Sequence, residues 1–495
     1  MQEIELKFQV SDAHGAALAR AVATKTAQRV SLRACYFDTA DRRLARAGLA
    51  LRVRKEGRRW VQALKGAGDG LWQRLEHEVA LQAAPGAVPQ ADAALHAGTA
   101  AGAALHDALA DGVLQPLYRT EVTRTRRLVR TPGGVVELAF DRGALLAGEQ
   151  RWPLCELEFE LKSGTPAALA ALAARWVDRF ELTLDTRSKA ERGERLLRGV
   201  RLGAAVKAQP LRLPRDADAP AALRAAVANC LRQVLGNASD LAHEAGADAE
   251  QLHQLRVGLR RLRTALRELG PLSPQVSPAW HEASTRLFRG LGAARDRDAL
   301  AQSLLPALHK AGAGGLQLPA PEAQPPVHLA LRDRATTRLW LQLLAFAAGD
   351  SDAASDAADA GRAAAPLAFA PAVAERLAKL FKQVRRDAAR FDALDDAARH
   401  RLRKRVKRLR YLSEFAAPAF RAKRVRAFLQ RLTPAQQALG RFNDVCVAQA
   451  LFGNVAAADP LAMFALGWLA HERDAAITRC VQALRPLRRA EVFWP

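Results

Sequence analysis

The chain begins MQEIELKF, a short run in which charged and apolar residues alternate. In a strand, alternate side chains point to the same face, so Glu3, Glu5 and Lys7 would share one face and the apolar residues the other. Two carboxylates at this spacing are well placed to bind one divalent metal ion, because Mg²⁺ and Mn²⁺ take hard oxygen ligands. The run therefore indicates a metal-binding strand face.

The same spacing of charged residues recurs in four other runs of the first 200 residues. Their i and i+2 positions hold Arg52 and Arg54; Arg74, Glu76 and Glu78; Arg124 and Arg126; and Glu156, Glu158 and Glu160. One interpretation is that these residues are the solvent-facing side of half-buried strands. So many strands of this kind favour instead a wet tunnel, because a barrel interior could not bury so many charges without a large penalty. Its cations suit phosphate oxygens and its carboxylates suit a metal, which indicates a metal-bound polyphosphate as ligand.

These charged positions fall in strand-like runs that glycine and proline turns separate. The runs are EIELKFQV, LALRVRKEG, RWVQALKG, RLEHEVALQ, YRTEVTRTRRLVRT, VVELAFDRGAL and LCELEFELKSG. They predict a multidomain α+β chain that starts with an eight-stranded antiparallel β tunnel or barrel, with helices near 12–27, 90–111 and 165–180. A proline-rich stretch then predicts a linker before an all-α part. The expected boundaries are 1–202 for the tunnel domain, 203–220 for the linker and 221–495 for the helical domain.

The helical part contains a basic repeat. HQLRVGLRRLR at 253–263 aligns without gaps with HRLRKRVKRLR at 400–410, and LGAARD at 291–296 echoes LGRFND at 439–444. Spacings of three and four place the basic residues along one helix face, beside a leucine stripe. They are His253, Arg256, Arg260 and Arg263 in the first copy and His400, Arg403, Lys407 and Arg410 in the second. The repeat predicts a pseudo-twofold bundle with copies near 221–310 and 371–490; alternatively, each stripe is a solvated helix face.

The charge of the chain is strongly positive and unevenly distributed. The formal net charge is +24. Residues 1–200 contain 30 basic and 24 acidic residues, whereas residues 201–495 contain 45 and 27. This balance predicts a polyanionic partner. Aromatic residues make up only 6% of the chain and no base-stacking motif is present, so polyphosphate is favoured over nucleic acid.

The remaining sequence features concern the compartment. The five cysteines have no disulfide or zinc spacing, and charged residues interrupt any apolar run after Met1. No apolar run reaches the roughly 18 residues of a membrane span. We therefore expect a cytoplasmic chain with reduced cysteines and no membrane partner; its oligomeric state stays open.

Six ordered blocks within the first 200 residues resemble the CYTH superfamily, the triphosphate tunnel metalloenzymes. They are EIELKF, CYFDTADRRLARAGLALRVR, ALKG, RLEHEV, LCELEFELKSG and RSKAERG. The resemblance implies a tunnel that hydrolyses or cyclises triphosphate compounds with Mg²⁺ or Mn²⁺. The metal ligands that it implies are Glu3 and Glu5, joined by Glu156 or Glu158. It also implies phosphate-binding residues at Lys7, Arg52, Arg54, Lys65, Arg124 and Arg126, tunnel-lining residues at Glu76 and Glu78, and Lys189 near the reacting phosphate.

The two copies of the basic repeat, in LHQLRVGLRRLRTAL and RHRLRKRVKRLRYL, resemble the CHAD domain, a helical domain named for its histidines. This resemblance implies that the basic residues of the repeat bind inorganic polyphosphate. Together the two resemblances predict a metal-dependent inorganic triphosphatase, acting on triphosphate or short polyphosphate, with a polyphosphate-binding domain and an association with polyphosphate granules. The alternatives are a non-catalytic polyphosphate-binding or granule-associated protein, and adenylate cyclase or thiamine triphosphatase activity in the tunnel.

Overall fold

The computed structural model describes residues 2–68, 72–82, 88–214, 216–244, 248–292, 300–301, 304–319, 325–349 and 367–495. The chain divides into two compact units, each assembled from separate stretches of sequence. Unit 1 comprises Met1–Val206, Leu231–Gln251 and Val327–Gly361; unit 2 comprises Lys207–Cys230, Leu252–Pro326 and Arg362–Pro495. The boundaries expected at 202 and 220 divide the chain into continuous stretches of sequence, and they stay predictions.

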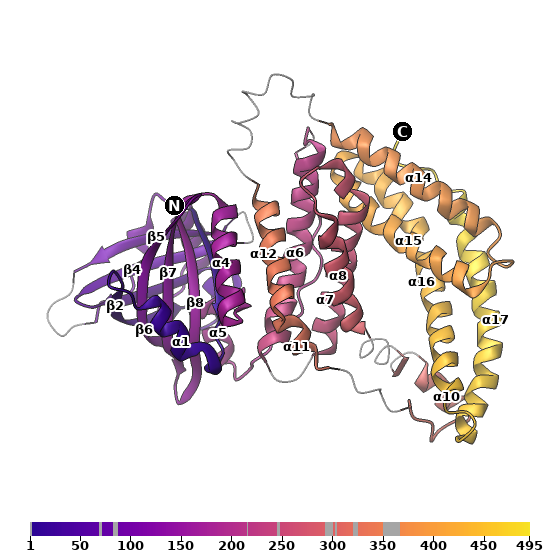
Figure 1. Ribbon diagram of the computed structural model, residues 1–495, viewed down its shortest axis with the longest axis horizontal. Coiled ribbons are helices and arrows are strands. Elements are labelled where there is room, and N and C mark those ends of the chain that lie inside the picture. The colour runs from indigo at the N-terminus through magenta and orange to yellow at the C-terminus, as the bar shows by residue number, and fades with distance from the viewer. Residues whose placement is uncertain are drawn as a thin grey trace. The chain divides into compact units, whose positions relative to one another are not determined.

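Unit 1 is built round a nine-stranded antiparallel sheet (Figure 1). The strands are β1 (Gln2–Gln9), β2 (Gln28–Asp38), β3 (Ala50–Glu56), β4 (Arg59–Ala67), β5 (Gln73–Leu81), β6 (Gln115–Thr131), β7 (Gly134–Ala147), β8 (Gln150–Gly164) and β9 (Thr183–Leu184). Their order is β5-β4-β3-β2-β6-β7-β8-β1-β9, and β1 also pairs with β5. The predicted antiparallel sheet is confirmed, but the expected count of eight strands is one short because the two-residue β9 pairs with β1.

Helices cover the apolar side of this sheet, as the alternation in the sequence requires. Phe8 on β1 packs edge-to-face on Phe159 of β8, which in turn contacts Trp176 on α4 (Pro166–Phe180). Thr165 caps α4 by accepting a hydrogen bond from the backbone N–H of Ala168, which fixes where the helix begins. With the apolar sides of the strands buried under helices, their charged sides are left to face inward. The three expected helical regions hold α1 (Asp12–Val22), α3 (Ala100–Leu109) and α4.

The second half of α6 (Ala219–His243) belongs to unit 1, together with the short helices α2 (Arg43–Arg46), α5 (Lys189–Leu197), α11 (Val327–Arg332) and α12 (Arg334–Ala348). Polar contacts hold α6 against the segment that precedes α5. The Thr186 backbone N–H donates to Ser239 Oγ at 3.0 Å. The buried Arg187 side chain pairs with Asp240 at 3.4 Å and with Glu244 at 2.7 Å. These contacts fix the position of α6 relative to α5.

His243, the last residue of α6, is expected to make unit 1 less stable in acid. Burial, together with the guanidinium groups of Arg187 and Arg332, lowers its pKa from 6.5 to about 4, although Asp185 opposes the shift. The unfolded chain therefore binds more protons in this pH window, and stability is lost as the pH falls from 6.5 to 4. Between pH 6.5 and 4, the free energy of unfolding measured by calorimetry should fall less for His243→Gln than for wild type. The difference should be at most about 3 kcal/mol. The exposed His106→Gln should keep the wild-type pH slope; identical slopes for all three chains would contradict this role of His243.

Unit 2 is helical, as predicted. Its helices are the first half of α6, most of α7 (Ala249–Glu268), α8 (Pro278–Gly290), α10 (Leu305–Lys310), α14 (Phe369–Ala389), α15 (Asp396–Ala416), α16 (Ala422–Gly453) and α17 (Pro460–Arg488). The two copies of the basic repeat lie on α7 and α15, and they contact each other reciprocally. Arg408 of α15 pairs with Glu268 of α7 at 3.0 Å, and Arg261 of α7 lies 4.0 Å from Glu414 of α15. The first trailing echo, 291–296, lies mostly outside the described residues.

None of the described helices combines the length and apolar character that a membrane span requires.

Candidate functional site

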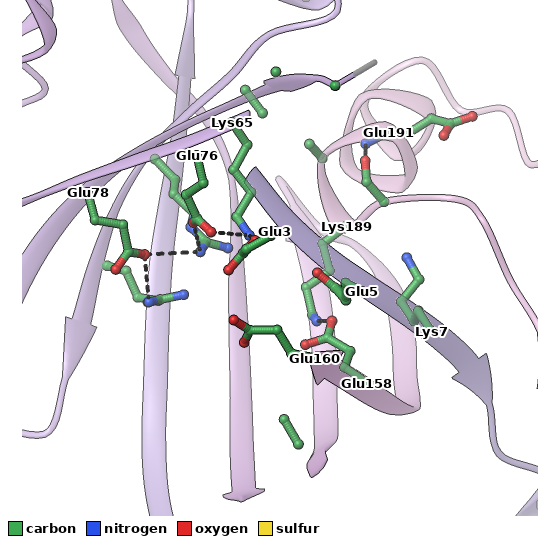
Figure 2. A pocket seen from close by; sticks show the side chains of 18 of the residues that line it. Glu3, Glu5, Lys7, Lys65, Glu76, Glu78, Glu158, Glu160, Lys189 and Glu191 are labelled. Carbon is green, nitrogen blue, oxygen red and sulfur yellow. Dashed lines mark hydrogen bonds and ion pairs between the residues drawn. The ribbon is translucent and has the colours of Figure 1, made fainter. Parts of the chain in front are cut away.

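The interior of the sheet in unit 1 encloses a cavity of about 670 Å³ with charged walls, called here the mixed-charge cavity (Figure 2). Most of the predicted tunnel residues line it: Glu3, Glu5, Lys7, Arg52, Arg54, Lys65, Glu76, Glu78, Arg124, Arg126, Glu158 and Lys189. Glu156, which was predicted as a metal ligand, is not among the lining residues. The side chain of Arg74 lies outside the described part of the chain. The structure thus brings together residues from strands at both ends of the sequence of unit 1.

One wall of the mixed-charge cavity, from β3 to β5, carries alternating ion pairs. The cross-strand register places Lys65 opposite Glu76, and the Lys65 ammonium lies 2.9 Å from that carboxylate and 3.1 Å from Glu3. Arg54 likewise lies 3.2 Å from Glu78. Each cation is held in place by carboxylates rather than by apolar packing. A phosphate oxygen that enters the cavity can therefore be bound by cations that are already positioned.

Glu3 and Glu76 meet on this wall as two neighbouring carboxyl groups. Burial and a hydrogen bond with Glu76 raise the pKa of Glu3 to about 8, although Lys65 acts in the opposite direction. The pair therefore shares one proton near neutral pH, because two close carboxylates are not both readily ionised in a buried site. Local negative charge of this kind is what a divalent cation relieves.

A second pair of facing carboxylates lies further along β1, where this strand pairs with β8. In the register of β1 and β8, Glu5 lies directly opposite Glu160 and Lys7 opposite Glu158 (Figure 2). Like charges directly opposite each other destabilise a sheet unless a cation lies between them. Oxygen ligands of this kind suit Mg²⁺ or Mn²⁺. The facing carboxylates of Glu5 and Glu160 are a donor set of the kind that fits a divalent metal, which would displace Lys162 from its present pairing with Glu160 at 2.5 Å.

Lys189, the first residue of α5, also lines the mixed-charge cavity. Its ammonium lies 2.8 Å from Asp141 and 2.7 Å from Glu158, and it also pairs with Glu156. Burial alone would lower the pKa of Lys189, but these three carboxylates raise it above its ordinary value. Arg124 adds a second cation, 2.7 Å from Asp141. The three carboxylates lie close enough together to hold a metal ion, but cations already neutralise them.

Glu156 and Glu160 show where sequence reasoning was incomplete. Glu156 is fully buried, and its carboxylate pairs with Lys189 and with Arg192 of α5, so its role as a metal ligand stays a prediction that the structure does not favour. Glu160, two strand positions beyond Glu158, lines the cavity instead. The alternation along β8 was the available signal for Glu160. No pattern in the sequence predicted the ion pair between Arg192 and Glu156.

Unit 2 has a cavity of its own, also of about 670 Å³, called here the basic cavity. Its cationic lining residues are Arg256, Arg260, Arg263, Arg267, Arg289, Arg401, Arg403, Lys404, Arg405, Lys407 and Arg408. Asp444 is the one acidic residue among the described lining residues, which also include His281 and His400. Arg408 pairs with Glu268 and Arg405 with Asp387, but the lining still carries far more cations than carboxylates, so this cavity suits an anionic ligand with several charges.

Aromatic and polar contacts position the cations of the basic cavity. The ring of Phe288 on α8 lies under three guanidinium groups, with centroid distances of 4.5 Å for Arg256, 5.8 Å for Arg260 and 5.0 Å for Arg263. Arg263 also donates to Thr285 Oγ1 at 3.0 Å. Arginines stacked in this way lose little further freedom when they bind an anion.

The pKa shifts in the basic cavity reflect repulsion between its cations. Burial and the neighbouring Arg289 and Arg260 lower the pKa of Arg263. Burial and the neighbouring arginines, Arg263 first among them, similarly lower the pKa of Lys404. The pKa of His400 is also lowered, by burial and by Lys404. A bound polyanion would reverse the electrostatic part of each shift.

Six of the eight predicted polyphosphate-binding residues line the basic cavity, and two do not. The six are Arg256, Arg260, Arg263, His400, Arg403 and Lys407. Arg410 turns instead to Glu414, at 2.8 Å, and to Gln436. His253 is also absent from the lining residues. The prediction that these two residues bind polyphosphate remains untested, but the structure gives it no support.

Comparison with known families assigns both parts of the chain. Residues 1–193 match the model of the CYTH domain, and residues 225–453 match the model of the CHAD domain. The chain contains a CYTH domain followed by a CHAD domain. The CYTH match spans all nine strands and the start of α5, while the CHAD match spans both copies of the basic repeat.

Two relatives represent the two domains. An inorganic triphosphatase of Haemophilus influenzae is 32% identical over 204 residues, which cover 39% of this chain and 54% of that protein. The chain thus matches about half the length of this curated relative. The crystal structure of the CHAD domain from the plant Ricinus communis is 32% identical, covers 59% of this chain and 99% of that one, and has a TM-score of 0.46.

Proposed function

We propose that the CYTH domain hydrolyses inorganic triphosphate with a divalent metal ion and that the CHAD domain binds inorganic polyphosphate. The observation that carries the first half is the composition of the mixed-charge cavity, which sets phosphate-binding cations and facing carboxylates round one enclosed space. The relative named as an inorganic triphosphatase supports this choice of substrate. The proposed activity is that of a phosphoanhydride hydrolase. A cytoplasmic location and an association with polyphosphate granules are part of the same proposal.

In this proposal, the residues of the mixed-charge cavity have distinct roles. Arg52, Lys65 and Arg124 bind phosphate oxygens and orient the chain, while Lys189 stabilises charge that develops on the transferring phosphoryl group. Glu5 and Glu160 would hold Mg²⁺ or Mn²⁺, which supplies Lewis-acid neutralisation of the phosphates when bound. The carboxylates that line the cavity also limit how a triphosphate can lie, since its charges avoid them and meet the cations.

The decisive experiment is phosphate release by the whole chain from tripolyphosphate, ATP, thiamine triphosphate and long polyphosphate, with Mg²⁺ or Mn²⁺. We expect tripolyphosphate to be turned over fastest. Preferential formation of a cyclic nucleotide from ATP, or preferential hydrolysis of thiamine triphosphate, would replace the proposed reaction by another one in the same cavity. Binding of polyphosphate without any turnover would favour a non-catalytic granule protein.

Glu5→Gln is expected to lower kcat/KM for tripolyphosphate by at least about 100-fold, because it removes one metal ligand charge while keeping the side-chain shape. Raising the metal concentration should recover part of the loss. The matched control is Glu149→Gln, at the exposed turn between β7 and β8, which should retain wild-type activity. Wild-type turnover by Glu5→Gln would contradict the proposed metal site.

A further inference from the structure

The mixed-charge cavity does not end with the CYTH-matched residues. Arg232, on the part of α6 that belongs to unit 1, also lines it. Arg232 lies within the stretch that matches the CHAD domain, 225–453. It also lines a second cavity of about 950 Å³ in unit 1, called here the side cavity. The two cavities share a rim that includes Tyr36, Ser188 and Glu191.

The contacts of α6 explain why Arg232 stands at this rim. Arg232, Gly236 and Ser239 lie four and seven residues apart, so they share one helix face. Ser239 binds the Thr186 backbone at 3.0 Å, and Asn237 exchanges two hydrogen bonds of 2.9 Å with the backbone of Val206. A β-carbon at Gly236 would lie 2.8 Å from the Val206 side chain, so this helix face packs closely. Arg232 is therefore held beside the segment that leads into α5.

Arg232 differs from the other charged residues at the rim because it remains available. Its side chain is exposed, and it makes no hydrogen bond or ion pair with another residue in the described part of the chain. The acids nearby already have partners: Glu191 binds Arg195 at 2.5 Å, and Glu194 lies 3.4 Å from Arg42. A phosphate at the rim would therefore meet a cation that need not leave a carboxylate first.

The mixed-charge cavity adjoins the side cavity beside Tyr36. The register of β2 with β3 places Tyr36 beside Arg52 and Leu32 beside Glu56. Tyr36 and Arg232 line both cavities, whereas Arg54 and Glu56 line only the mixed-charge cavity. An anionic chain longer than the mixed-charge cavity can therefore continue past Tyr36 into the side cavity, where its extra phosphates would meet Arg232.

We propose that Arg232 is a chain-length-specificity residue, which binds the phosphates of linear polyphosphates that extend beyond the three held inside the mixed-charge cavity. This rests on the proposed hydrolysis of phosphate chains by the CYTH domain. The substrate class is linear inorganic polyphosphate of four or more phosphates, and the CHAD-matched helix α6 supplies part of its binding site. Triphosphate itself is held by the inner cations and does not need Arg232.

The test compares kcat/KM for tripolyphosphate and linear tetraphosphate in the whole chain. Arg232→Ala should lower kcat/KM for tetraphosphate about tenfold, mainly through KM, the size expected for one charge-assisted hydrogen bond. For tripolyphosphate, kcat/KM should stay within about twofold of wild type. An equal loss for both substrates would instead indicate a structural effect. Arg232→Lys should restore part of the tetraphosphate preference. Arg224→Ala, elsewhere on α6, is the matched control and should keep the wild-type ratio.

Two outcomes would overturn the role of Arg232. One is an unchanged ratio of the two substrates in Arg232→Ala; the other is an equal loss for both substrates. A wild-type chain that releases no phosphate from either substrate would instead contradict the proposed hydrolysis. In that case calorimetric binding of the same two phosphate chains decides, and equal affinities of wild type and Arg232→Ala for tetraphosphate would contradict the proposed contact.

Discussion

Replacing Lys189 by methionine is expected to destabilise unit 1 and to abolish most phosphate release. The variant keeps the length of the side chain but leaves Asp141, Glu156 and Glu158 without the ammonium that lies among them. Removing one partner of a buried ion pair typically costs about 3–5 kcal/mol. Arg124 and Arg192 still pair with these carboxylates, so we expect a loss near the lower end of that range. Loss of a preorganised cation at the reacting phosphate lowers kcat by about 100-fold or more. Chemical unfolding and phosphate release measure the two effects separately.

A double variant separates the structural effect of Lys189 from its effect on the reaction. Adding Glu158→Gln to Lys189→Met removes one of the three carboxylates that Lys189 helps to neutralise, so stability should partly recover while turnover does not. Lys162→Met is a matched control for stability, since its ion pair with Glu160 is 40% exposed on the lysine side and contributes less than about 1 kcal/mol. Full stability of Lys189→Met would contradict the view that these carboxylates depend on this ammonium.

The mixed-charge cavity was predictable because a strand has a side-chain period of two that needs no tertiary information. Charge at i and i+2 placed Glu3, Glu5 and Lys7 on one face, and the same spacing in four other runs indicated that this face is interior. The spacing did not predict which residues along one strand face line the cavity. Glu156 and Glu160 share a face of β8, but α5 packs over Glu156 and leaves Glu160 on the cavity. Where a distant helix packs on a strand cannot be read from the strand itself.

The helical half shows the same limit more strongly. Arg263 and Arg410 hold equivalent positions in the repeat, yet Arg263 stacks on Phe288 and lines the basic cavity, while Arg410 pairs with Glu414. The 3.6-residue period selects a helix face but not the neighbour that the face meets. The linker expected at 203–220 also gave no sign that α6 beyond Leu231 belongs with the sheet. That contact depends on pairs such as Thr186 with Ser239, which lie far apart in sequence.

The second large effect is expected in polyphosphate binding by the basic cavity. Arg403→Ala with Lys407→Ala removes two of its eleven cations, both on α15. Affinity for long linear polyphosphate should fall by about 10- to 100-fold at low salt. The plot of log affinity against log salt should also become shallower by about 1.4, if each lost phosphate contact releases as much counterion as on a single-stranded nucleic acid. Calorimetry across a salt series measures both quantities.

The binding comparison uses Glu5→Gln as the background for every chain, so that bound polyphosphate is not consumed and the mixed-charge cavity is the same throughout. The matched control, Arg410→Ala with Lys423→Ala, removes the same net charge but leaves the lining of the basic cavity intact. If only the cavity variant loses affinity, the ligand is bound locally by the cavity. If both variants lose affinity equally, polyphosphate responds only to the net charge of the chain, and the basic cavity is not its site. Displacement of polyphosphate by DNA at equal phosphate concentration would point instead to nucleic acid as the ligand.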